Sequence, residues 1–276
     1  MRIDAHQHYW KVERGDYGWL TPEQGILYRD YGPDELCPEL AQQQMERTIV
    51  VQAAPTVGET RYLLELCERE ESLAGVVGWV DLEDDGVERL LDELARSPYF
   101  KGVRPMLQDL EDDAYILRSQ VLRSLSLLAE RGLTLDILVR PRHLPYVAEM
   151  LERVPELAAV VDHIAKPAIA GGELEPWLSG LEKVASHPQV FCKLSGLVTE
   201  ADLAHWTDAD IRPYVTEVCR LFGPERLMFG SDWPVCLLAA SYGEVAALLE
   251  RLLPDSWGEA ERAAVFGGNA ARFYRI

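Results

Sequence analysis

The sequence is poor in basic residues and has no long apolar run. Its 276 residues include 27 Lys and Arg against 46 Asp and Glu, which gives a formal net charge of −19. Nucleic acids and anionic membranes are bound mainly through a basic face, so we expect neither as a partner. A small anionic molecule stays compatible with this charge, because a local Arg or Lys can dominate inside a pocket.

Paired cysteines and targeting signals are also lacking. The five cysteines are scattered without a Cys-x-x-Cys motif, and their number is odd. This pattern argues against a disulfide framework or a structural zinc site and favours reduced, buried thiols. Residues 1–30 contain no apolar segment of the kind found in secretion signals, and no run of about 18 apolar residues occurs. We therefore expect a cytoplasmic protein.

Short apolar runs alternate with segments of helical period along the whole chain. The runs are 2–6, 47–53, 73–80, 100–106, 133–139, 157–164, 189–194 and 226–231, and the helical segments include 61–71, 86–97, 122–132, 147–154 and 215–223. Each run has the length and composition of a strand buried on both faces. The alternation predicts an α/β fold with a single domain over residues 1–276, a parallel eight-stranded (β/α)8 TIM barrel. A doubly wound open sheet is the alternative, but no Gly-rich sequence follows the first strand.

Residues 9–46 interrupt the regular spacing between the first two strands. The segment contains six aromatic residues, among them Trp10, Tyr17, Trp19, Tyr28 and Tyr31. A loop of this length in a compact domain is usually functional, and in a barrel it would lie at the catalytic face. We predict a long active-site loop, with the alternative that its aromatic side chains only pack it onto the barrel rim.

The active site of this fold lies at the C-terminal ends of the strands, so the residues at those positions are the candidates. They are His6, His8, Gln52, Trp79, Asp81, Arg104, Asp136, Arg140, Asp162, His163, Lys166, Lys193, Ser195, Ser231, Asp232 and Trp233. Three of the six histidines would therefore converge on one opening.

His6 and His8 end the first predicted strand, two residues apart. Residues i and i+2 of a strand share a face, so both imidazoles should point to the same side. Two convergent imidazoles can hold Zn²⁺ or direct N–H donors at a carbonyl oxygen. Asp232 ends the eighth strand, which neighbours the first in a closed barrel. A carboxylate among imidazoles suits a metal ligand or a general base for water, whereas the simpler alternative is a helix N-cap.

Three further side chains have a structural alternative beside the functional one. His163 follows the apolar run 158–161 and would otherwise be a hydrogen-bonded core histidine. Arg104 and Lys193 can clamp a carboxylate or polarise a carbonyl, or they can pair with acidic residues.

Several segments of the sequence, in this order, resemble the amidohydrolase superfamily. They are Asp-Ala-His-Gln-His-Tyr-Trp at 4–10, Gly-Val-Arg at 102–104, Asp-His-Ile-Ala-Lys-Pro at 162–167, Lys-Leu-Ser-Gly at 193–196, Gly-Ser-Asp-Trp-Pro at 230–234 and Gly-Gly-Asn-Ala-Ala-Arg-Phe-Tyr at 267–274. The similarity is greatest to amidohydrolase-related family 2 and its lactonase branch, typified by L-fuconolactonase and L-rhamnonolactonase. It implies a barrel of the metal-dependent-hydrolase type that opens the ring ester of a small sugar-acid lactone.

The resemblance also assigns roles to the candidates. It implies Asp232, His163 and Arg104 as the catalytic residues, and His6, His8 and Asp232 as ligands of one divalent metal, with zinc the first choice and a metal-free site the alternative. The residues expected to bind the substrate are Trp79, Lys193, Lys166, Gln52, Trp10 and Trp233. Strand four ends in Arg104 and strand five has no histidine, so a two-metal centre is not expected.

Three other functions stay open on the sequence alone. A lactonase of an unsaturated dicarboxylate lactone would need several arginines around the pocket. A metal-dependent decarboxylase of the same superfamily would need a histidine at strand five. An inactive barrel could serve as a binding module. Apolar helical faces such as 246–249 would suit a homo-oligomer, although packing against the barrel explains them equally well.

Overall fold

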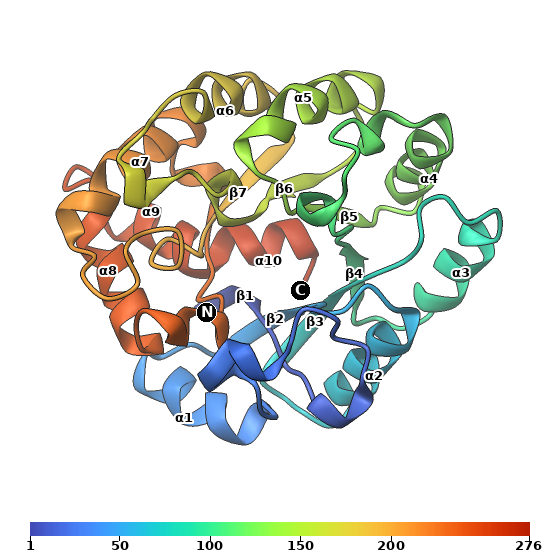
Figure 1. Cartoon of the computed structure of the whole chain (residues 1–276), viewed down its shortest axis with the longest axis horizontal. Helices are drawn as coiled ribbons and strands as arrows, with labels where there is room; N and C mark the ends of the chain where they lie inside the picture. Colours follow the sequence, from blue (N-terminus) through green and yellow to red (C-terminus); the bar gives the residue numbers. More distant parts are fainter.

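The computed structural model describes residues 1–276 and shows eight parallel strands in a ring, surrounded by helices (Figure 1). The strands are β1 (Ile3–Gln7), β2 (Arg47–Val51), β3 (Leu73–Gly78), β4 (Phe100–Val103), β5 (Thr134–Ile137), β6 (Ala159–Val161), β7 (Val190–Leu194) and β8 (Leu227–Phe229). Each pairs with the next in sequence order. Two backbone hydrogen bonds join β1 to the segment after β8, from His8 N to Trp233 O (2.7 Å) and from Asp232 N to His6 O (2.8 Å). The predicted (β/α)8 barrel is confirmed.

Helices follow the strands on the outside of the barrel. They are α1 (Pro33–Gln42), α2 (Val57–Cys67), α3 (Val87–Leu94), α4 (Ser119–Glu130), α5 (Leu144–Arg153), α6 (Trp177–Ala185), α7 (Asp208–Phe222), α8 (Tyr242–Leu252), α9 (Glu259–Ala263) and α10 (Asn269–Tyr274). Helix α2 begins earlier than its apolar period suggests, because the Thr56 hydroxyl accepts a hydrogen bond from Glu59 N (3.0 Å) and caps the first turn.

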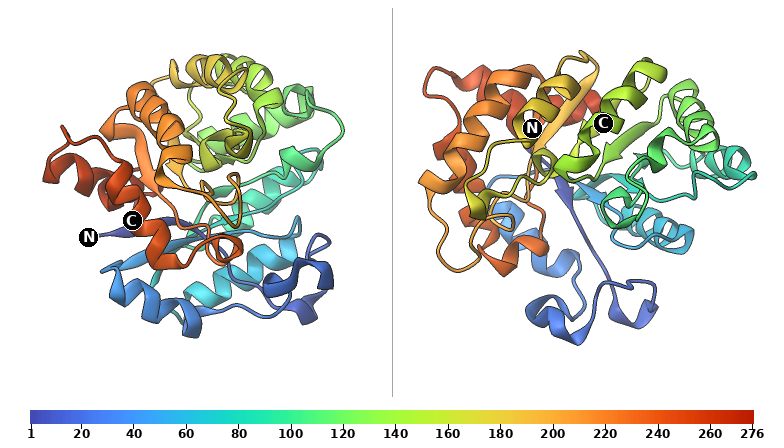
Figure 2. Two further views of the ribbon diagram at one scale, coloured as in Figure 1. Left: turned by 60° about the vertical axis from the view of Figure 1, so that its left-hand side comes forward. Right: turned by 45° about the horizontal axis from the view of Figure 1, so that its top comes forward.

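The segment expected as one long loop contains a barrel helix. Within 9–46, helix α1 occupies Pro33–Gln42, and the irregular part between β1 and α1 is therefore shorter than expected. Pro33 and Pro38 obscure the helical pattern, although Pro33 lies in the first turn, where its missing N–H costs no hydrogen bond. The irregular part, drawn in dark blue, extends away from the barrel to one side (Figure 2).

The last helix closes the N-terminal end of the barrel. Ala270, Phe273 and Tyr274 of α10 pack with side chains of five strands, which are Ile3, Ala5, Ile49, Val51, Val77, Val160 and Met228. Helix α10 accordingly crosses the middle of the ring in Figure 1. Both chain termini lie at this end, close to each other (Figure 2, left). The opposite end, where the strands finish, is left to the loops.

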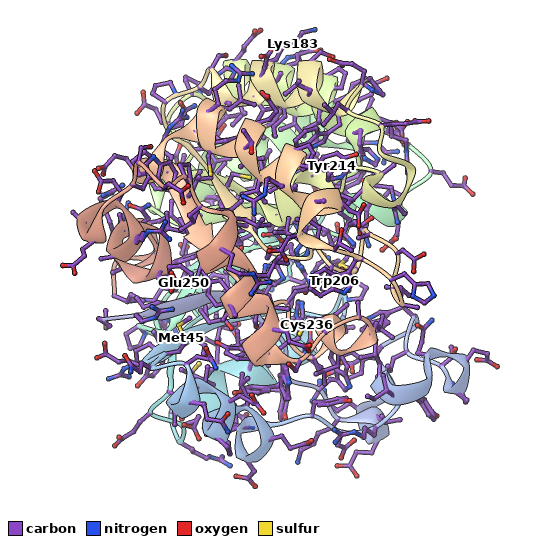
Figure 3. All side chains as sticks on the ribbon, turned by 90° about the vertical axis from the view of Figure 1, so that its left-hand side faces the viewer. Met45, Lys183, Trp206, Tyr214, Cys236 and Glu250 are labelled. Atoms are coloured by element: carbon purple, nitrogen blue, oxygen red, sulfur yellow. The ribbon has the colours of Figure 1, made fainter.

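Charged side chains project from the outer helices and leave a closed interior. Lys183 of α6 is exposed, whereas Tyr214 of α7 and Cys236 are buried (Figure 3).

All five cysteines are free thiols. None of the helices has the length and apolar character needed to cross a membrane.

Candidate active site

A cavity of about 250 Å³ opens at the C-terminal ends of the strands. Its lining combines basic, acidic and apolar side chains, namely His8, Trp19, Ala53, Arg104, Met106, Gln108, Asp109, Leu138, His163, Lys166, Asp232 and Val235. Five of the predicted site residues are among them: His8, Arg104, His163, Lys166 and Asp232. They come from four different strand ends, which only the barrel brings together.

The carboxylate of Asp232 is surrounded by imidazole nitrogens. Its Oδ1 atom lies 3.2 Å from His8 Nε2, 3.7 Å from His6 Nε2 and 3.9 Å from His163 Nε2. All four side chains are nearly or fully buried. His6 lies below the other two histidines, with its Nε2 atom 3.2 Å from His8 Nε2.

Burial keeps two of these imidazoles neutral at physiological pH. It lowers the pKa of His6 well below the ordinary value, and it lowers the pKa of His163 from 6.5 to about 4. Burial alone would raise the pKa of Asp232, but its interactions with His163, His8 and His6 outweigh that effect, and the pKa is lowered from its usual value. Asp232 is therefore ionised at neutral pH and can accept a proton.

The same atoms fit a single divalent metal ion. His8 Nδ1 lies 2.7 Å from the carbonyl oxygen of Val51 and donates its proton there, which directs Nε2 toward Asp232. Ligand atoms of a tetrahedral zinc ion are about 3.3 Å apart, given bonds of about 2.0–2.2 Å. The separations among His6 Nε2, His8 Nε2 and Asp232 Oδ1 are 3.2, 3.2 and 3.7 Å. The donor types and their spacing match such a site.

A strained turn presents His163 to the cavity. Residues His163, Ile164, Ala165 and Lys166 all have positive φ angles, from 48° to 63°, which L-residues rarely adopt. The turn is held by a hydrogen bond from Trp177 Nε1 to Ile164 O (2.6 Å). Strain of this kind persists where surrounding structure enforces it and is concentrated at functional sites.

Two neighbours fix the ring of His163 itself. Its Nδ1 atom lies 2.9 Å from Ser195 Oγ, so Nε2 is directed toward Asp232. Gly196 has a φ of +62°, and a Cβ atom at this position would lie 2.7 Å from His163 Nδ1. Only glycine leaves room for the ring, which explains the Ser195-Gly196 pair after β7.

Arg104 lies between the cavity and the residues beneath it. Its Nη1 atom is 3.4 Å from Asp162 Oδ2 and 3.3 Å from His6 Nε2, and Nη2 donates to the carbonyl oxygen of Gln52. The Nε–H group is buried and has no partner in the protein. Arg104 lines the cavity as a residue, but this nitrogen is shielded from it.

The chain was compared with known proteins. The family model described as "Amidohydrolase" matches residues 3–276. The chain belongs to the amidohydrolase family. An L-fucono-1,5-lactonase from Burkholderia ambifaria is 46% identical over 279 residues, covering 100% of this chain and 96% of the relative. A second L-fucono-1,5-lactonase, from Burkholderia multivorans, is 42% identical over 286 residues with the same coverage. A crystal structure of a B. multivorans amidohydrolase with bound zinc has a TM-score of 0.94 and 41% identity, and covers 100% of this chain and 99% of that one.

Two predicted substrate-binding residues of this amidohydrolase lie beneath the cavity. Lys193 is fully buried inside β7, where its ammonium group contacts Asp136, Asp162 and His6. Gln52 is fully buried as well, and its Nε2 atom donates to the Arg104 carbonyl oxygen (2.8 Å). Neither residue lines the cavity. Lys166 does line it, and forms an ion pair with Glu200 (3.2 Å).

The three predicted tryptophans also lie outside the catalytic cavity. Trp10 and Trp233 are buried and both pack edge-on against Tyr31, at 5.5 and 5.2 Å between ring centroids. Trp79 lines a neighbouring, more apolar cavity of about 410 Å³, which shares Trp19, Met106 and Asp109 with the catalytic one. Trp19 is therefore the aromatic residue of the first loop that faces the catalytic cavity.

Sequence reasoning gave no role to several residues that line the cavity. They are Trp19, Ala53, Met106, Gln108, Asp109, Leu138 and Val235. Most lie just beyond a strand end, where the loop conformation decides which side chain turns inward. Trp19 had a signal, since it is an aromatic residue of the loop after β1.

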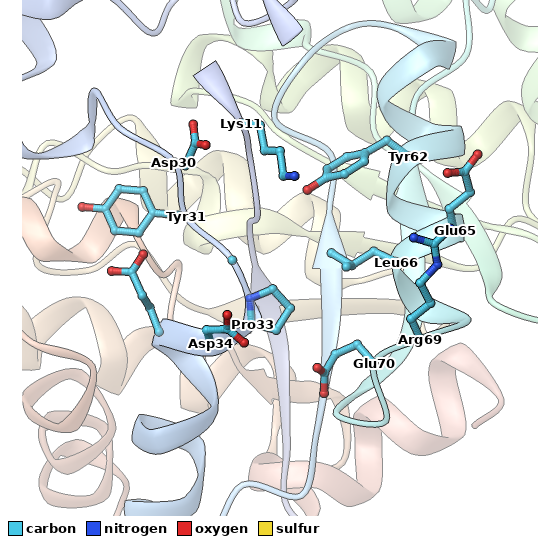
Figure 4. Close-up of a pocket in the computed structure, with 12 residues that line it drawn as sticks. Lys11, Asp30, Tyr31, Pro33, Asp34, Tyr62, Glu65, Leu66, Arg69 and Glu70 are labelled. Carbon is cyan, nitrogen blue, oxygen red and sulfur yellow. The ribbon is translucent and has the colours of Figure 1, made fainter. Parts of the chain in front are cut away.

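A larger cleft of about 470 Å³ lies on the outer surface of the amidohydrolase (Figure 4). It runs between the first loop and α1 on one side and α2 on the other, and its lining includes Asp30, Glu65 and Glu70 together with Lys11 and Arg69. It shares no residue with the catalytic cavity and contains no histidine. The larger cleft is therefore not the one that contains the candidate catalytic residues.

Proposed function

We propose that this amidohydrolase opens the ring ester of L-fucono-1,5-lactone or a closely related sugar-acid lactone. The observation that carries the proposal is the ionised carboxylate of Asp232, placed beside the imidazoles of His6, His8 and His163 at a small cavity. The two Burkholderia relatives named L-fucono-1,5-lactonase support the substrate class, because they match over the whole chain at 46% and 42% identity.

Asp232 acts as the general base in this proposal. It takes a proton from a water molecule, and the resulting hydroxide attacks the lactone carbonyl carbon. The negative charge that develops on the carbonyl oxygen needs a donor, and each well-placed donor lowers the barrier by roughly 3–4 kcal/mol. The guanidinium group of Arg104, a cation in the cavity lining, is the candidate for such a donor. When the ring opens, the alkoxide leaving group takes the proton back from Asp232, and the carboxylic acid that is formed releases its own proton to give a hydroxy acid anion.

His6, His8 and Asp232 would hold a divalent metal ion. Such an ion supplies Lewis-acid polarisation of a carbonyl oxygen and lowers the pKa of water. His163 is neutral in the site described here, and its Nε2 atom lies 3.9 Å from Asp232 Oδ1. Lys166 offers a positive charge to the product carboxylate.

The cavity suits a small, partly apolar molecule. Its volume of about 250 Å³ lies below the range of about 300–1,000 Å³ that is typical of sites for larger ligands. Gln108, Asp109 and Lys166 can bind hydroxyl groups. Met106, Leu138 and Val235 provide apolar contacts, which a deoxy sugar with a methyl group would use.

The alternative chemistries fit this cavity less well. An unsaturated dicarboxylate needs several cations, but Arg104 and Lys166 are the only ones in the lining, and Asp109 would repel it. Arg140 is exposed and does not line the cavity. A decarboxylase of this superfamily would place a histidine after β5, where this chain has Leu138.

The test is proton release in weak buffer over a panel of aldonolactones and one unsaturated dicarboxylate lactone. We expect turnover of six-carbon sugar lactones above the spontaneous rate, and a loss of about 10²–10⁴-fold in kcat for Asp232→Asn. Asp81→Asn is the matched control, because Asp81 is an exposed carboxylate outside the cavity. Full activity of Asp232→Asn, or hydrolysis of the dicarboxylate alone, would contradict the proposal.

A further inference from the structure

A charged cluster lies inside the barrel below the catalytic cavity. Asp136 of β5, Asp162 after β6 and Lys193 of β7 are all fully buried. The interior of such a barrel is normally filled by layers of branched apolar side chains. Burying ions is costly, and replacing a buried ion pair by apolar residues is often neutral or stabilising. Stability alone therefore does not account for this cluster.

The cluster connects the closed end of the barrel to the active site. The Tyr274 hydroxyl, in the last turn of α10, donates to the Asp136 carboxylate at 2.9–3.1 Å. Asp136 accepts a hydrogen bond from the Lys193 ammonium group. That group in turn lies 3.1 Å from Asp162 Oδ1 and 3.2 Å from His6 Nδ1. The contacts form a continuous series from Tyr274 to His6.

The series ends on the side of His6 that faces away from the substrate. In the site without a metal ion, the Nδ1 atom accepts from Lys193 (3.2 Å) and lies 3.3 Å from Asp162 Oδ1, which leaves the ring proton on Nε2, facing His8 and Asp232. An imidazole with its Nδ1 side fixed cannot rotate, so its Nε2 atom stays directed at the reacting groups.

We propose that Lys193 is a positioning residue that holds the His6 imidazole toward Asp232, and that Asp136 and Tyr274 hold Lys193 in place. This inference rests on the proposed lactone hydrolysis only for its kinetic readout. It gives a role to a lysine that does not reach the cavity.

The experiment separates positioning from stability by a charge-balanced replacement. Lys193→Met alone leaves two buried carboxylates short of a partner and is expected to destabilise the protein. The double variant Lys193→Met with Asp136→Asn removes one charge of each sign, and the amide oxygen introduced at position 136 can still accept the Tyr274 hydrogen bond. We expect it to recover an unfolding temperature near that of the wild type, with kcat lowered about 10–100-fold and KM nearly unchanged.

A milder variant tests the far end of the series. Tyr274→Phe removes only the hydroxyl group and is expected to lower kcat by a few-fold, again with little change in KM. Tyr214→Phe is the matched control, since the Tyr214 hydroxyl is also bonded inside the fold, to the carbonyl oxygen of Glu173 (3.1 Å), but is not part of the series.

Crystal structures of the wild type and the double variant give a readout that needs no substrate. We expect the His6 ring to be rotated or disordered in the double variant. The proposal would be overturned if the His6 ring of the double variant kept the wild-type orientation. It would also be overturned if the double variant regained kcat together with stability. A wild type that hydrolyses no lactone would contradict the proposed function alone, and the ring orientation would still decide the role of Lys193.

Discussion

The protonation of individual side chains determines when the cavity can act. Asp232 must be ionised to accept a proton, and a protonated His163 beside it would oppose proton transfer by stabilising the carboxylate. Burial lowers the pKa of His163 from 6.5 to about 4, so the neutral form persists well into the acidic range. The catalytic state is therefore expected over a wide span of pH.

We predict that kcat/KM for the lactone stays level from neutral pH down to about pH 5 and falls near pH 4, the pKa of His163. The free energy of unfolding is expected to depend on the protonation of the same histidine. Because the folded-state pKa lies below the unfolded value, the unfolded chain binds more protons between pH 4 and 6.5, and the free energy of unfolding rises with pH over that window. Initial rates in a series of buffers and urea unfolding at the same pH values measure both. An acidic limb near pH 6.5, the value of an exposed histidine, would contradict the assignment.

The sequence predicted which residues gather near the active site better than it predicted whether each one lines the cavity or lies beneath it. His8, His163 and Asp232 lie just after their strands, and all three line the cavity. Lys193 lies within β7, and its side chain stays inside the barrel one layer lower. A strand pattern tells which side of the sheet a residue faces, but two residues on the same face and only two positions apart can lie in the cavity wall and in the layer beneath it.

Strands and helices were predictable from the sequence where a single local pattern, such as a continuous apolar run, determined them. The eight strands appear as continuous apolar runs because helices cover one face and the barrel interior covers the other. Helix α1 was not predicted, since Pro33 and Pro38 interrupt its pattern. Helix α10 was missed for another reason: it packs across the end of the barrel rather than along its side, a placement that no local pattern encodes.

Some aromatic residues of the first loop pack it onto the barrel rim, and one faces the cavity. Trp10 packs edge-on against Trp19 and Tyr31, at 5.3 and 5.5 Å between ring centroids, which fixes the loop on the rim. Trp19 is only partly buried, faces the cavity and donates from Nε1 to the carbonyl oxygen of Ala53 (2.8 Å). One set of rings thus anchors the loop, and one ring forms part of the cavity wall.

We predict that Trp19→Ala raises KM for the lactone about tenfold, which corresponds to about 1.4 kcal/mol, with a smaller change in kcat. The physical reason is the loss of an aromatic wall of the cavity. Steady-state kinetics and thermal unfolding check this together. Tyr28→Ala serves as the control, because Tyr28 is an exposed aromatic residue of the same loop (40% exposed). Equal KM values for the two variants would exclude a substrate contact at Trp19.

At the scale of the whole molecule, the candidate metal ligands lie on both sides of the junction between the first and the last strand, where the barrel closes. His6 and His8 belong to the first strand and its end, whereas Asp232 follows the eighth strand. The same place carries the two backbone hydrogen bonds that join β1 to the segment after β8. A metal ion bound here would therefore bridge the two ends of the sheet.

We predict that zinc raises the unfolding temperature of the protein stripped of metal by chelation. Binding to the native state alone adds about 2.7 kcal/mol at a free concentration of 100 times Kd. Differential scanning fluorimetry over a zinc series measures the shift. His8→Asn is expected to abolish it, while His205→Asn, a change at an exposed histidine, should retain it. An equal shift in both variants would place the ion elsewhere.

The first strand and the last helix supply the two ends of the contact series, and this has a consequence for biosynthesis. His6 is synthesised before all the other members of the series and Tyr274 after them, and a nascent chain begins to fold from its N-terminal side. The barrel cannot close until β8 reaches β1, and α10, which follows, covers its open end only afterwards. A chain that stopped before Tyr274 would have every group of the cavity and lack the hydroxyl group that donates to Asp136. Under the proposed positioning role of the series, full activity therefore depends on a helix that is synthesised after every strand and every cavity residue.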